Sequence, residues 1–197
     1  MTHLRTERLE LAPVTSENAA VLWRIMQTSR LREFQDVPRF TRDDFERRVA
    51  ARPATFDSRA LGRFEWLIVV RETNVPIGWV SLRIGDHALR TAEVGYSLIA
   101  GQRARGYATE AVRAIVDYAF EASDLRQLDA CCVPANVASR RLLSRLRFSE
   151  IRVQRNGAIV RGRPVDIVIF ALEREDWSSA QGESRNSIVI PASARQK

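Results

Sequence analysis

The spacing of hydrophobic residues changes along the chain between a period of two and a period near 3.6, which predicts both strands and helices. Hydrophobic and polar residues alternate through Leu9, Leu11 and Pro13, as expected of a strand that ends at proline. Further strand-like runs, each bounded by turn-forming residues, are predicted at 65–71, 76–84, 92–100, 126–133, 149–154 and 165–172.

Helical spacing predicts helices at 18–26, after Thr41, in a stretch that ends near Ser123, and at 136–146. Three consecutive strands joined by short turns should pair antiparallel, whereas a strand that follows a long helical crossover should pair parallel. This order predicts an α+β domain. Its mixed, mostly antiparallel sheet should have about seven strands, flanked by about four helices.

The chain has 197 residues, of which 45% are hydrophobic and 28% charged, and this length and composition agree with a single domain. The domain is expected to span 1–177, and 178–197, rich in Ser, Asn, Gln and Arg, is expected to be a flexible tail. No hydrophobic run approaches the roughly 20 residues of a membrane span, and the first residues lack the hydrophobic core of a secretion signal. We therefore expect no membrane partner and a cytoplasmic location.

The net charge of +7 comes almost entirely from arginine, since Lys197 is the only lysine. The arginines are scattered among Asp and Glu, unlike those of a nucleic-acid-binding arm. Nucleic acid is therefore not expected as a main ligand, although contact with ribosomal RNA or an acidic partner stays open.

Cysteine and histidine are scarce: Cys131 and Cys132 are adjacent, and His3 and His87 are the only histidines. Because successive side chains of a strand point to opposite faces, the two cysteines are expected to be small strand residues rather than a disulfide or a shared metal site. Two cysteines and two histidines are few residues from which to build a zinc site or a Ser-His-Asp triad, so neither is favoured.

The segment GQRARGYATEAVRAIVDYAF at 101–120 begins as a glycine-punctuated cationic loop and continues as an amphipathic helix. The first turn of a helix leaves about four N–H groups without an intrahelical acceptor, and the helix dipole adds partial positive charge there. Gly106 would let the backbone approach a ligand closely, and Arg103 and Arg105 could add charge-assisted hydrogen bonds. These features favour an anion site, with an ordinary loop-to-helix junction and solvated arginines as the alternative.

This element order, with RARGYATEAV after the fourth strand, resembles the GNAT superfamily of acyl-CoA N-acyltransferases. The acyl-CoA loop of that family, Q/R-x-x-G-x-G/A, is matched by Arg103, Gly106 and Ala108. The longer form GYATEA, the segment VPANVASRRLLSRLRF and the opening TERLELAP are similar to the RimJ/RimL branch, whose best-known members acetylate protein N-termini. The resemblance covers roughly residues 3–177.

The resemblance implies a sheet splayed between its fourth and fifth strands, acetyl-CoA as cosubstrate, an amine acceptor and no metal, and it leaves room for a homodimer. The pyrophosphate of coenzyme A would lie on backbone N–H groups of the loop, and the pantetheine arm would pair with strand edges. The implied cofactor-binding residues are Leu98, Ile99, Arg103, Ala104, Arg105, Gly106, Tyr107, Ala108, Thr109, Asn136 and Ser139.

Two positions depart from the family's pattern, since Ala104 and Arg147 stand where many relatives have glycine. Ala104 can still donate its N–H unless the site needs a positive φ, and a left-handed arginine at 147 would cost about 1 kcal/mol. We therefore expect cofactor binding to be retained. Gly95, inside the fourth strand, indicates a bulge or a close approach of neighbouring groups.

Acyl transfer from a thioester to an amine needs a base for the amine, donors for the oxyanion and a proton for the departing thiolate. Glu93 is the candidate base, with a surface acid at a strand start as the alternative. Ser139 is the candidate donor to the thiolate, because its counterpart in the RimJ/RimL branch contacts the cofactor near its sulfur; back-bonding within the helix is the alternative. A backbone N–H near Leu98 is the expected oxyanion donor, and Glu110 and Tyr96 are interpreted as structural residues.

The first two helices and the loop at 52–64 are expected to form the acceptor wall. The resemblance favours acetyl transfer to a protein or peptide N-terminal α-amine, whose pKa of about 8 needs only a modest base. A polyamine, an amino acid or an aminoglycoside as acceptor, and a non-catalytic acyl-CoA-binding module, stay open. Aromatic candidates for the wall are Trp23, Phe34, Phe40 and Trp66, and acidic candidates that could attract an amine are Asp43, Asp44 and Glu46. The alternative for each of them is a core or a solvated residue.

Overall fold

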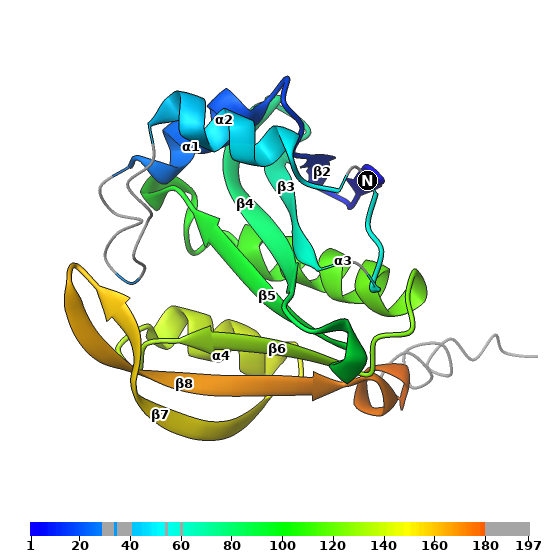
Figure 1. Cartoon of the computed structure of the whole chain (residues 1–197), viewed down its shortest axis with the longest axis vertical. Helices are drawn as coiled ribbons and strands as arrows, with labels where there is room; N and C mark the ends of the chain where they lie inside the picture. Colours follow the sequence, from blue (N-terminus) through cyan, green and yellow to red (C-terminus); the bar gives the residue numbers. More distant parts are fainter. Residues whose placement is uncertain (29–33, 35–40, 54, 60, 180–197) are drawn as a thin grey trace, which may run out of the picture.

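The computed structural model describes residues 1–28, 34, 41–53, 55–59 and 61–179, and most of the expected tail, 180–197, lies outside the described residues. The described chain forms one eight-stranded mixed sheet in the order β1-β2-β3-β4-β5-β6-β8-β7 (Figure 1). The strands are β1 (Leu4–Arg5), β2 (Leu9–Pro13), β3 (Gly62–Val70), β4 (Val75–Ile84), β5 (Thr91–Leu98), β6 (Gln127–Cys132), β7 (Ser149–Val160) and β8 (Arg163–Glu173).

The strand count exceeds the prediction because the first hydrophobic segment folds into two strands. β1 and β2 pair antiparallel, with Leu4 opposite Leu11. Thr6 closes the turn between them: its N–H donates to the carbonyl oxygen of Leu9 at 2.9 Å, and its Oγ1 accepts from the Leu9 N–H at 2.9 Å.

The sheet direction agrees with the prediction. β2 to β5 are antiparallel neighbours, and β6 pairs parallel with β5. This parallel ladder joins only 91–93 of β5 to 127–129 of β6. Beyond it the two strands, the fourth and fifth of the sequence-based prediction, run on without pairing and diverge, as Figure 1 shows.

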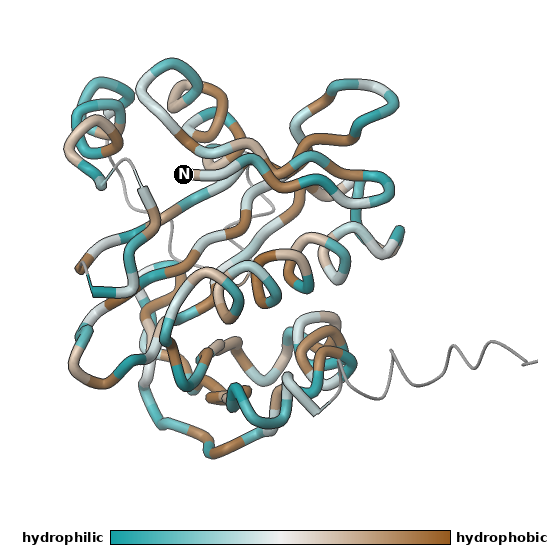
Figure 2. Tube along the Cα trace, turned by 90° about the vertical axis from the view of Figure 1, so that its right-hand side faces the viewer, coloured by the Kyte–Doolittle hydropathy of each residue, from teal (hydrophilic) through white to brown (hydrophobic). Residues whose placement is uncertain are grey.

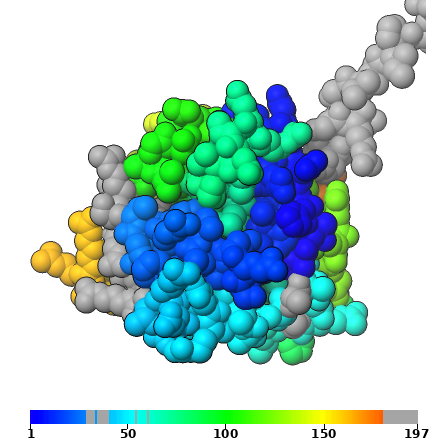
Figure 3. All heavy atoms as spheres, turned by 90° about the horizontal axis from the view of Figure 1, so that it is seen from above, coloured from blue at the N-terminus to red at the C-terminus, as the bar shows by residue number. Residues whose placement is uncertain are grey.

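The helices cover both faces of the sheet. Thr41 caps α2 by accepting the N–H of Asp44 at 3.1 Å. Figure 3 shows α1 in blue and α2 in cyan side by side at one end of the molecule. The helices are α1 (Ala19–Met26), α2 (Arg42–Ala50), α3 (Tyr107–Glu121) and α4 (Val137–Arg145), with short 3-10 turns η2 (His87–Leu89) and η3 (Ala100–Gln102). Residues 174–179 after β8 are also helical, so the first two positions of the expected tail continue a helix.

Two hydrophobic clusters hold these helices on opposite faces. Along β3, Trp66 faces the cluster under α3 and α4, whereas Leu67 faces the cluster under α1 and α2. Hydrophobic positions run along the strands at the centre of the molecule (Figure 2). This packing fixes the start of α3 near the end of β5. The buried face of α3 consists of Ala111, Val112, Ile115, Val116, Ala119 and Phe120.

The last two strands are longer than predicted. The turn-forming residues at 156–164 were expected to end a strand, but β7 continues to Val160. The chain reverses at Arg161 and Gly162, with φ of 53° and 75°. The pairing with β8 is irregular between Gln154 and Ala158, so the Asn-Gly dipeptide marks an irregularity inside the strand rather than its end.

Candidate functional site

A cavity of ≈ 1130 Å³ opens where β5 and β6 diverge. Its walls come from β3, β4 and β5, from the segment before α3, and from α2, α4, β6 and β7. Two predicted site residues, Ile99 and Arg105, do not line it. The other predicted residues do: Glu93, Leu98, Arg103, Ala104, Gly106, Tyr107, Ala108, Thr109, Asn136 and Ser139.

The segment between η3 and α3 passes twice through the left-handed region. Ala104 has φ 61°, and Gly106, the N-cap of α3, has φ 82°. Ala104 therefore adopts the conformation that glycine adopts most easily. The site does have a positive φ at position 104, where many relatives have glycine. The first backbone bond of α3 runs from the N–H of Glu110 to Gly106 at 3.1 Å, so the N–H groups at 107–109 point out of the helix end. These donors and Arg103 suit the diphosphate of coenzyme A.

The turn between β1 and β2 holds this segment from outside the cavity. Arg8 donates from Nε to Glu110 at 2.7 Å and from Nη1 to the carbonyl oxygen of Arg105 at 2.9 Å, and its guanidinium lies 4.8 Å from the centre of the Tyr107 ring. Burial raises the pKa of Glu110, but hydrogen bonds from Thr6 and Arg8 outweigh burial, so this pKa lies below its ordinary value. Glu110 is thus an ionised residue that ties the start of α3 to the N-terminal turn.

The backbone of β5 presents an unpaired edge to the cavity. The N–H of Ile99 donates to the carbonyl oxygen of Ile77 in β4 at 2.9 Å, so it is engaged within the sheet. Because successive N–H groups of a strand point to opposite sides, the N–H of Leu98 points into the gap between β5 and β6. Leu98 therefore has the orientation that an oxyanion donor needs, and Ile99 does not.

Gly95 lies in a regular stretch of β5, opposite Ser81. The bulge alternative is therefore wrong. A Cβ atom at Gly95 would lie 2.9 Å from Oγ of Ser81, which supports the alternative of a close approach.

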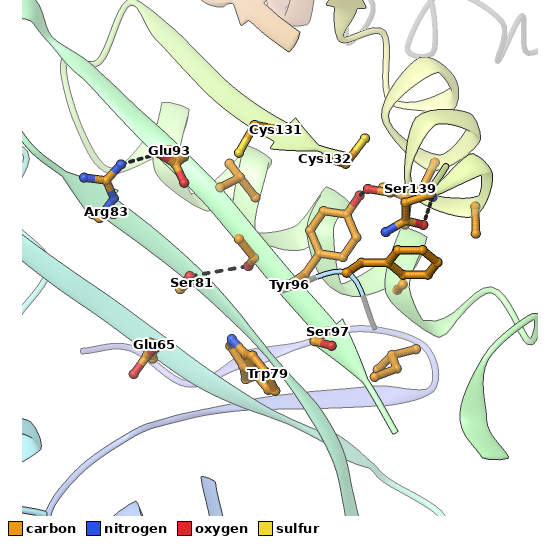
Figure 4. Close-up of a pocket in the computed structure, with 18 of the residues that line it drawn as sticks. Glu65, Trp79, Ser81, Arg83, Glu93, Tyr96, Ser97, Cys131, Cys132 and Ser139 are labelled. Carbon is orange, nitrogen blue, oxygen red and sulfur yellow. Dashed lines mark hydrogen bonds and ion pairs between the residues drawn. The ribbon is translucent and has the colours of Figure 1, made fainter. Parts of the chain in front are cut away.

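Ser139, in the first turn of α4, contacts a tyrosine that the sequence indicated as structural. The hydroxyl oxygens of Ser139 and Tyr96 lie 2.7 Å apart (Figure 4). Asn136 caps α4 by accepting the N–H of Ser139 at 3.1 Å. Burial raises the pKa of Tyr96, so its hydroxyl keeps its proton. Sequence reasoning missed this contact because β5 and α4 meet only in the folded chain.

Glu93 lies at the last paired position of β5 before the strands diverge, opposite Arg83 in β4 and Asp129 in β6. Its carboxylate is hydrogen-bonded to Arg83, and its side chain remains 37% exposed (Figure 4). Burial, followed by the charge of Glu93, raises the pKa of Asp129 against a hydrogen bond from Gln127. Glu93 thus combines access with a place at the divergence, and its role as base stays a prediction.

A second carboxylate in the cavity, Glu65 in β3, was absent from the predicted site. It lies opposite Ser81 in β4, and its side chain is only 2% exposed. It accepts a hydrogen bond from Arg52, and its Oε1 lies 3.5 Å from Nη1 of Arg63. In the sequence, Glu65 could have been found as the one carboxylate inside the hydrophobic run 64–70. A buried charge usually has a partner or a function.

The aromatic acceptor wall was predicted only in part. Phe34 lines the cavity, whereas Trp23 packs against the cluster under α1 and α2. Trp66 is fully buried in the main core and donates its Nε1–H to the carbonyl oxygen of Thr2 at 3.0 Å, so it is a core residue, the alternative that the sequence left open, and not part of the wall. Phe40 lies outside the described residues.

The acidic residues proposed for the wall lie on the outer surface of α2. Asp44 accepts hydrogen bonds from Thr41 and Arg47, and Glu46 pairs with Arg42. Asp43, Asp44 and Glu46 are absent from the cavity lining. The charges that line this side of the cavity therefore differ from those predicted.

The two adjacent cysteines differ in their exposure. Cys132 is buried, whereas the side chain of Cys131 is accessible from the cavity that it lines. Partial desolvation in the cavity wall raises the pKa of Cys131 to about 11, so its thiol stays protonated. Within the described ranges, no three His, Cys, Asp or Glu residues are grouped so that they could hold a metal ion. The described helices include none that is long and apolar enough to span a membrane.

Sequence comparison identifies relatives over most of the chain. Residues 8–149 match the model of the acetyltransferase (GNAT) domain. Over 180 residues the chain is 29% identical to the uncharacterized N-acetyltransferase p20 of Bacillus licheniformis, across 90% of this chain and 99% of the relative. Over 100 residues it is 33% identical to the putative ribosomal N-acetyltransferase YdaF of Bacillus subtilis strain 168, across 51% of this chain and 55% of that protein.

Solved structures of ribosomal-protein acetyltransferases share the fold. The ribosomal-protein-S5-alanine acetyltransferase from Vibrio fischeri gives a TM-score of 0.76 at 20% identity, over 90% of this chain and 99% of that one. RimL, a ribosomal L7/L12 α-N-protein acetyltransferase in complex with coenzyme A, gives 0.78 at 17% identity, over 89% and 99%. With the family model matched across most of the domain, the chain belongs to the GNAT acetyltransferase family and is an acyl-CoA-dependent N-acetyltransferase.

Proposed function

We propose that the protein transfers the acetyl group of acetyl-CoA to the α-amine of a protein or peptide N-terminus. The observation that carries the reaction is the meeting, in one cavity, of the left-handed segment before α3, the unpaired edge of β5 and Ser139 of α4. The acceptor class is supported by similar proteins named as acetyltransferases of ribosomal proteins.

Acetyl-CoA supplies the activated acetyl group when bound, and the chain's own groups bind and orient it. The N–H groups at 107–109 and the guanidinium of Arg103 would hold the diphosphate. The open edge of β5 would pair with the amides of the pantetheine arm, as an added strand pairs with a sheet edge.

Three groups of the chain would then act on the reacting atoms. Glu93 takes a proton from the acceptor amine, directly or through one water, and the N–H of Leu98 donates to the carbonyl oxygen of the acetyl group. The amine nitrogen forms its bond to the carbonyl carbon as the carbon–sulfur bond breaks. The hydroxyl of Ser139 donates a hydrogen bond to the departing sulfur, which leaves as the coenzyme A thiolate and takes its proton from solvent, while Glu93 releases the amine proton to solvent.

Tyr96 is a positioning residue in this scheme. A serine hydroxyl has one proton and can also accept a hydrogen bond. Because Tyr96 keeps its own proton, it can donate to Oγ of Ser139 and leave the serine proton directed at the sulfur. The raised pKa of Tyr96 makes it a donor rather than a base.

Mass spectrometry of a cell lysate incubated with the enzyme and isotopically labelled acetyl-CoA tests the acceptor. We expect label on protein N-termini. Label on polyamines, amino acids or aminoglycosides alone would overturn the proposed acceptor. Cofactor binding without any labelled product would instead favour a non-catalytic module.

Glu93→Gln tests the base. We expect slow transfer at neutral pH that recovers partly as the pH rises past about 8, because the α-amine then deprotonates without a base. The control is Glu72→Gln, which removes an exposed carboxylate from the turn between β3 and β4. A pH–rate profile unchanged by Glu93→Gln would assign Glu93 to structure.

A further inference from the structure

Among the described residues, five charged side chains from the segment after α2 and from β3, β4 and β5 line the cavity, and we call them the acceptor face: Arg52, Arg63, Glu65, Arg83 and Glu93. Arg48 of α2 also lines this side of the cavity and is not included in the acceptor face. Arg63, Arg83 and Glu93 lie in one row across three strands, since Arg63 is opposite Arg83 and Arg83 is opposite Glu93. Opposed residues of neighbouring strands share a face of the sheet. The row therefore joins the proposed base to an arginine two strands away.

The acceptor face contains three guanidinium groups and two carboxylates. Arg83 pairs with Glu93, and Arg52 pairs with Glu65. Arg63 lies 3.5 Å from Oε1 of Glu65, a carboxylate that Arg52 already engages, and the side chain of Arg63 is 44% exposed. One positive charge is therefore not neutralised within the acceptor face.

Other arginines line the opposite side of the cavity and are not part of this count. Arg103 precedes α3, and Arg141 and Arg145 belong to α4. These elements flank the proposed diphosphate site, where the ligand itself brings negative charge. The excess charge on the acceptor face is therefore available to an anion other than the diphosphate.

We propose that the acceptor N-terminus carries an acidic side chain at its second or third residue, and that Arg63 binds this carboxylate. This inference rests on the proposed function, whose acceptor class it narrows. Neighbouring strands lie about 4.8 Å apart, so the backbones at Arg63 and Glu93 are separated by about 10 Å. An extended peptide advances about 3.5 Å per residue, so an amine at Glu93 places the next one or two side chains within reach of Arg63.

The same charges disfavour the cationic alternatives. A polyamine or an aminoglycoside would bring further positive groups toward Arg63 and Arg83. Like charges at such short range repel, whereas an opposite charge is attracted and screened by salt. The acceptor face therefore disfavours ligands with several positive charges, such as polyamines and aminoglycosides.

Binding to the protein saturated with coenzyme A, measured by calorimetry, tests the inference without turnover. The probes are C-terminally amidated tetrapeptides that differ only at the second and third residues, both of which are aspartate, asparagine or lysine. We expect the aspartate peptide to bind about tenfold more tightly than the asparagine peptide at low salt, and the lysine peptide to bind most weakly. The preference should shrink at high salt. Equal affinity for the aspartate and asparagine peptides would overturn the inference.

Variants assign the preference to one residue. Arg63→Gln should reduce it to about twofold, whereas Arg63→Lys should retain most of it because the charge remains. Arg126→Gln is the matched control, since it removes an exposed arginine that does not line the cavity. Arg63 is preferred to Arg52, whose removal would leave the buried Glu65 carboxylate without its direct hydrogen bond. A preference that persists unchanged in Arg63→Gln would contradict the assignment.

A parallel thiol-release assay with the same peptides, free aspartate and spermidine separates this inference from the proposed function. A binding preference without turnover of any peptide would overturn the proposed function and support the acceptor face. Turnover of all peptides at equal rates, with equal binding, would overturn the inference alone. Tighter binding of free aspartate than of the aspartate peptide would overturn the peptide acceptor as the source of the carboxylate.

Discussion

The cofactor side and the acceptor side of the cavity differ in how far apart in the sequence their residues lie. On the cofactor side, the proposed diphosphate site is a short continuous segment, in which Ala104 and Gly106 turn the backbone and the N–H groups at 107–109 follow directly. The acceptor side combines side chains from β3, β4, β5 and the segment after α2. Backbone donors can be placed by local conformation alone, whereas a set of charged side chains exists only after the strands take their register.

One contact on the cofactor side does join residues that lie far apart in the sequence. Arg8, far away in the sequence, contacts both Glu110 and the carbonyl oxygen of Arg105. The local segment is therefore supported by a tertiary contact. Substitutions on the two sides test how far each depends on local conformation and how far on such contacts.

The largest effect is expected from Gly106→Val. The residue has φ 82°, and a Cβ there would lie 3.2 Å from Nη2 of Arg8, so a β-branched side chain should distort the start of α3. Acetyl-CoA at a hundredfold excess over its Kd should stabilise the wild type by about 2.7 kcal/mol, and the variant not at all. Thermal unfolding with and without acetyl-CoA measures this.

Gly101→Val is the control, because a Cβ at Gly101 meets nothing within 4 Å. It should keep the stabilisation by acetyl-CoA. An equal shift in both variants would show that the cofactor side does not depend on the left-handed cap.

The next largest effect is expected at the contact between Tyr96 of β5 and Ser139 of α4. Ser139→Ala should lower kcat by about 100-fold, and Tyr96→Phe by about tenfold, with little change in the KM for acetyl-CoA. If Tyr96 acts only through Ser139, the double variant should be no slower than Ser139→Ala alone. Steady-state kinetics of the three variants give the answer.

Tyr118→Phe provides the matched control, because Tyr118 packs against Phe56 and Trp66 and does not line the cavity. It should leave kcat unchanged. A double variant that multiplies the two single effects would mean that Tyr96 acts independently of Ser139.

Glu110→Gln tests the tertiary support of the cofactor side. Because the pKa of Glu110 is lowered by folding, its carboxylate stabilises the protein above the unfolded-state value of about 4.3, and this stabilisation is lost as the pH falls through the folded pKa. We expect Glu110→Gln to cost about 2 kcal/mol at pH 7 and progressively less below pH about 4. Urea unfolding across this pH range measures the difference.

Glu121→Gln, at the exposed end of α3, is the control and should have little effect at either pH. A loss in Glu110→Gln that is independent of pH would show that the ion pair with Arg8 does not support the segment.

The smallest effect is a gain in stability from Arg147→Gly. Arg147 has φ 65°, and α4 ends in two bonds, from the N–H of Phe148 to Leu143 and from the N–H of Arg147 to Ser144, both at 3.0 Å. Glycine removes the strain of a left-handed side chain, so the free energy of unfolding should rise by about 1 kcal/mol. Arg147→Ala keeps the Cβ atom and should give no gain. A gain in both variants would point to the arginine side chain rather than to the backbone.

Some structural features followed from residue types because they depend on near neighbours. Thr41 and Asn136 cap their helices as N-cap preferences indicate. Ala104 and Arg147 both have a positive φ, and both stand where the family's pattern has glycine. By contrast, the Asn-Gly pair at 156–157 is a typical turn signal that lies inside β7, because pairing with β8 outweighed the local preference.

Periodicity thus determined the order of the elements, the antiparallel and parallel pairing and the place of the loop before α3, since each depends on residues close together in the chain. Only the tertiary structure decided that Tyr96 contacts Ser139, that Arg8 supports Glu110, and that Trp66 belongs to the core. It also decided that Glu65 and Arg63 belong to the cavity and that the acidic residues of α2 do not. A change of one residue in the register of β3 would move Glu65 to the opposite face of the sheet, and no local pattern fixes that register.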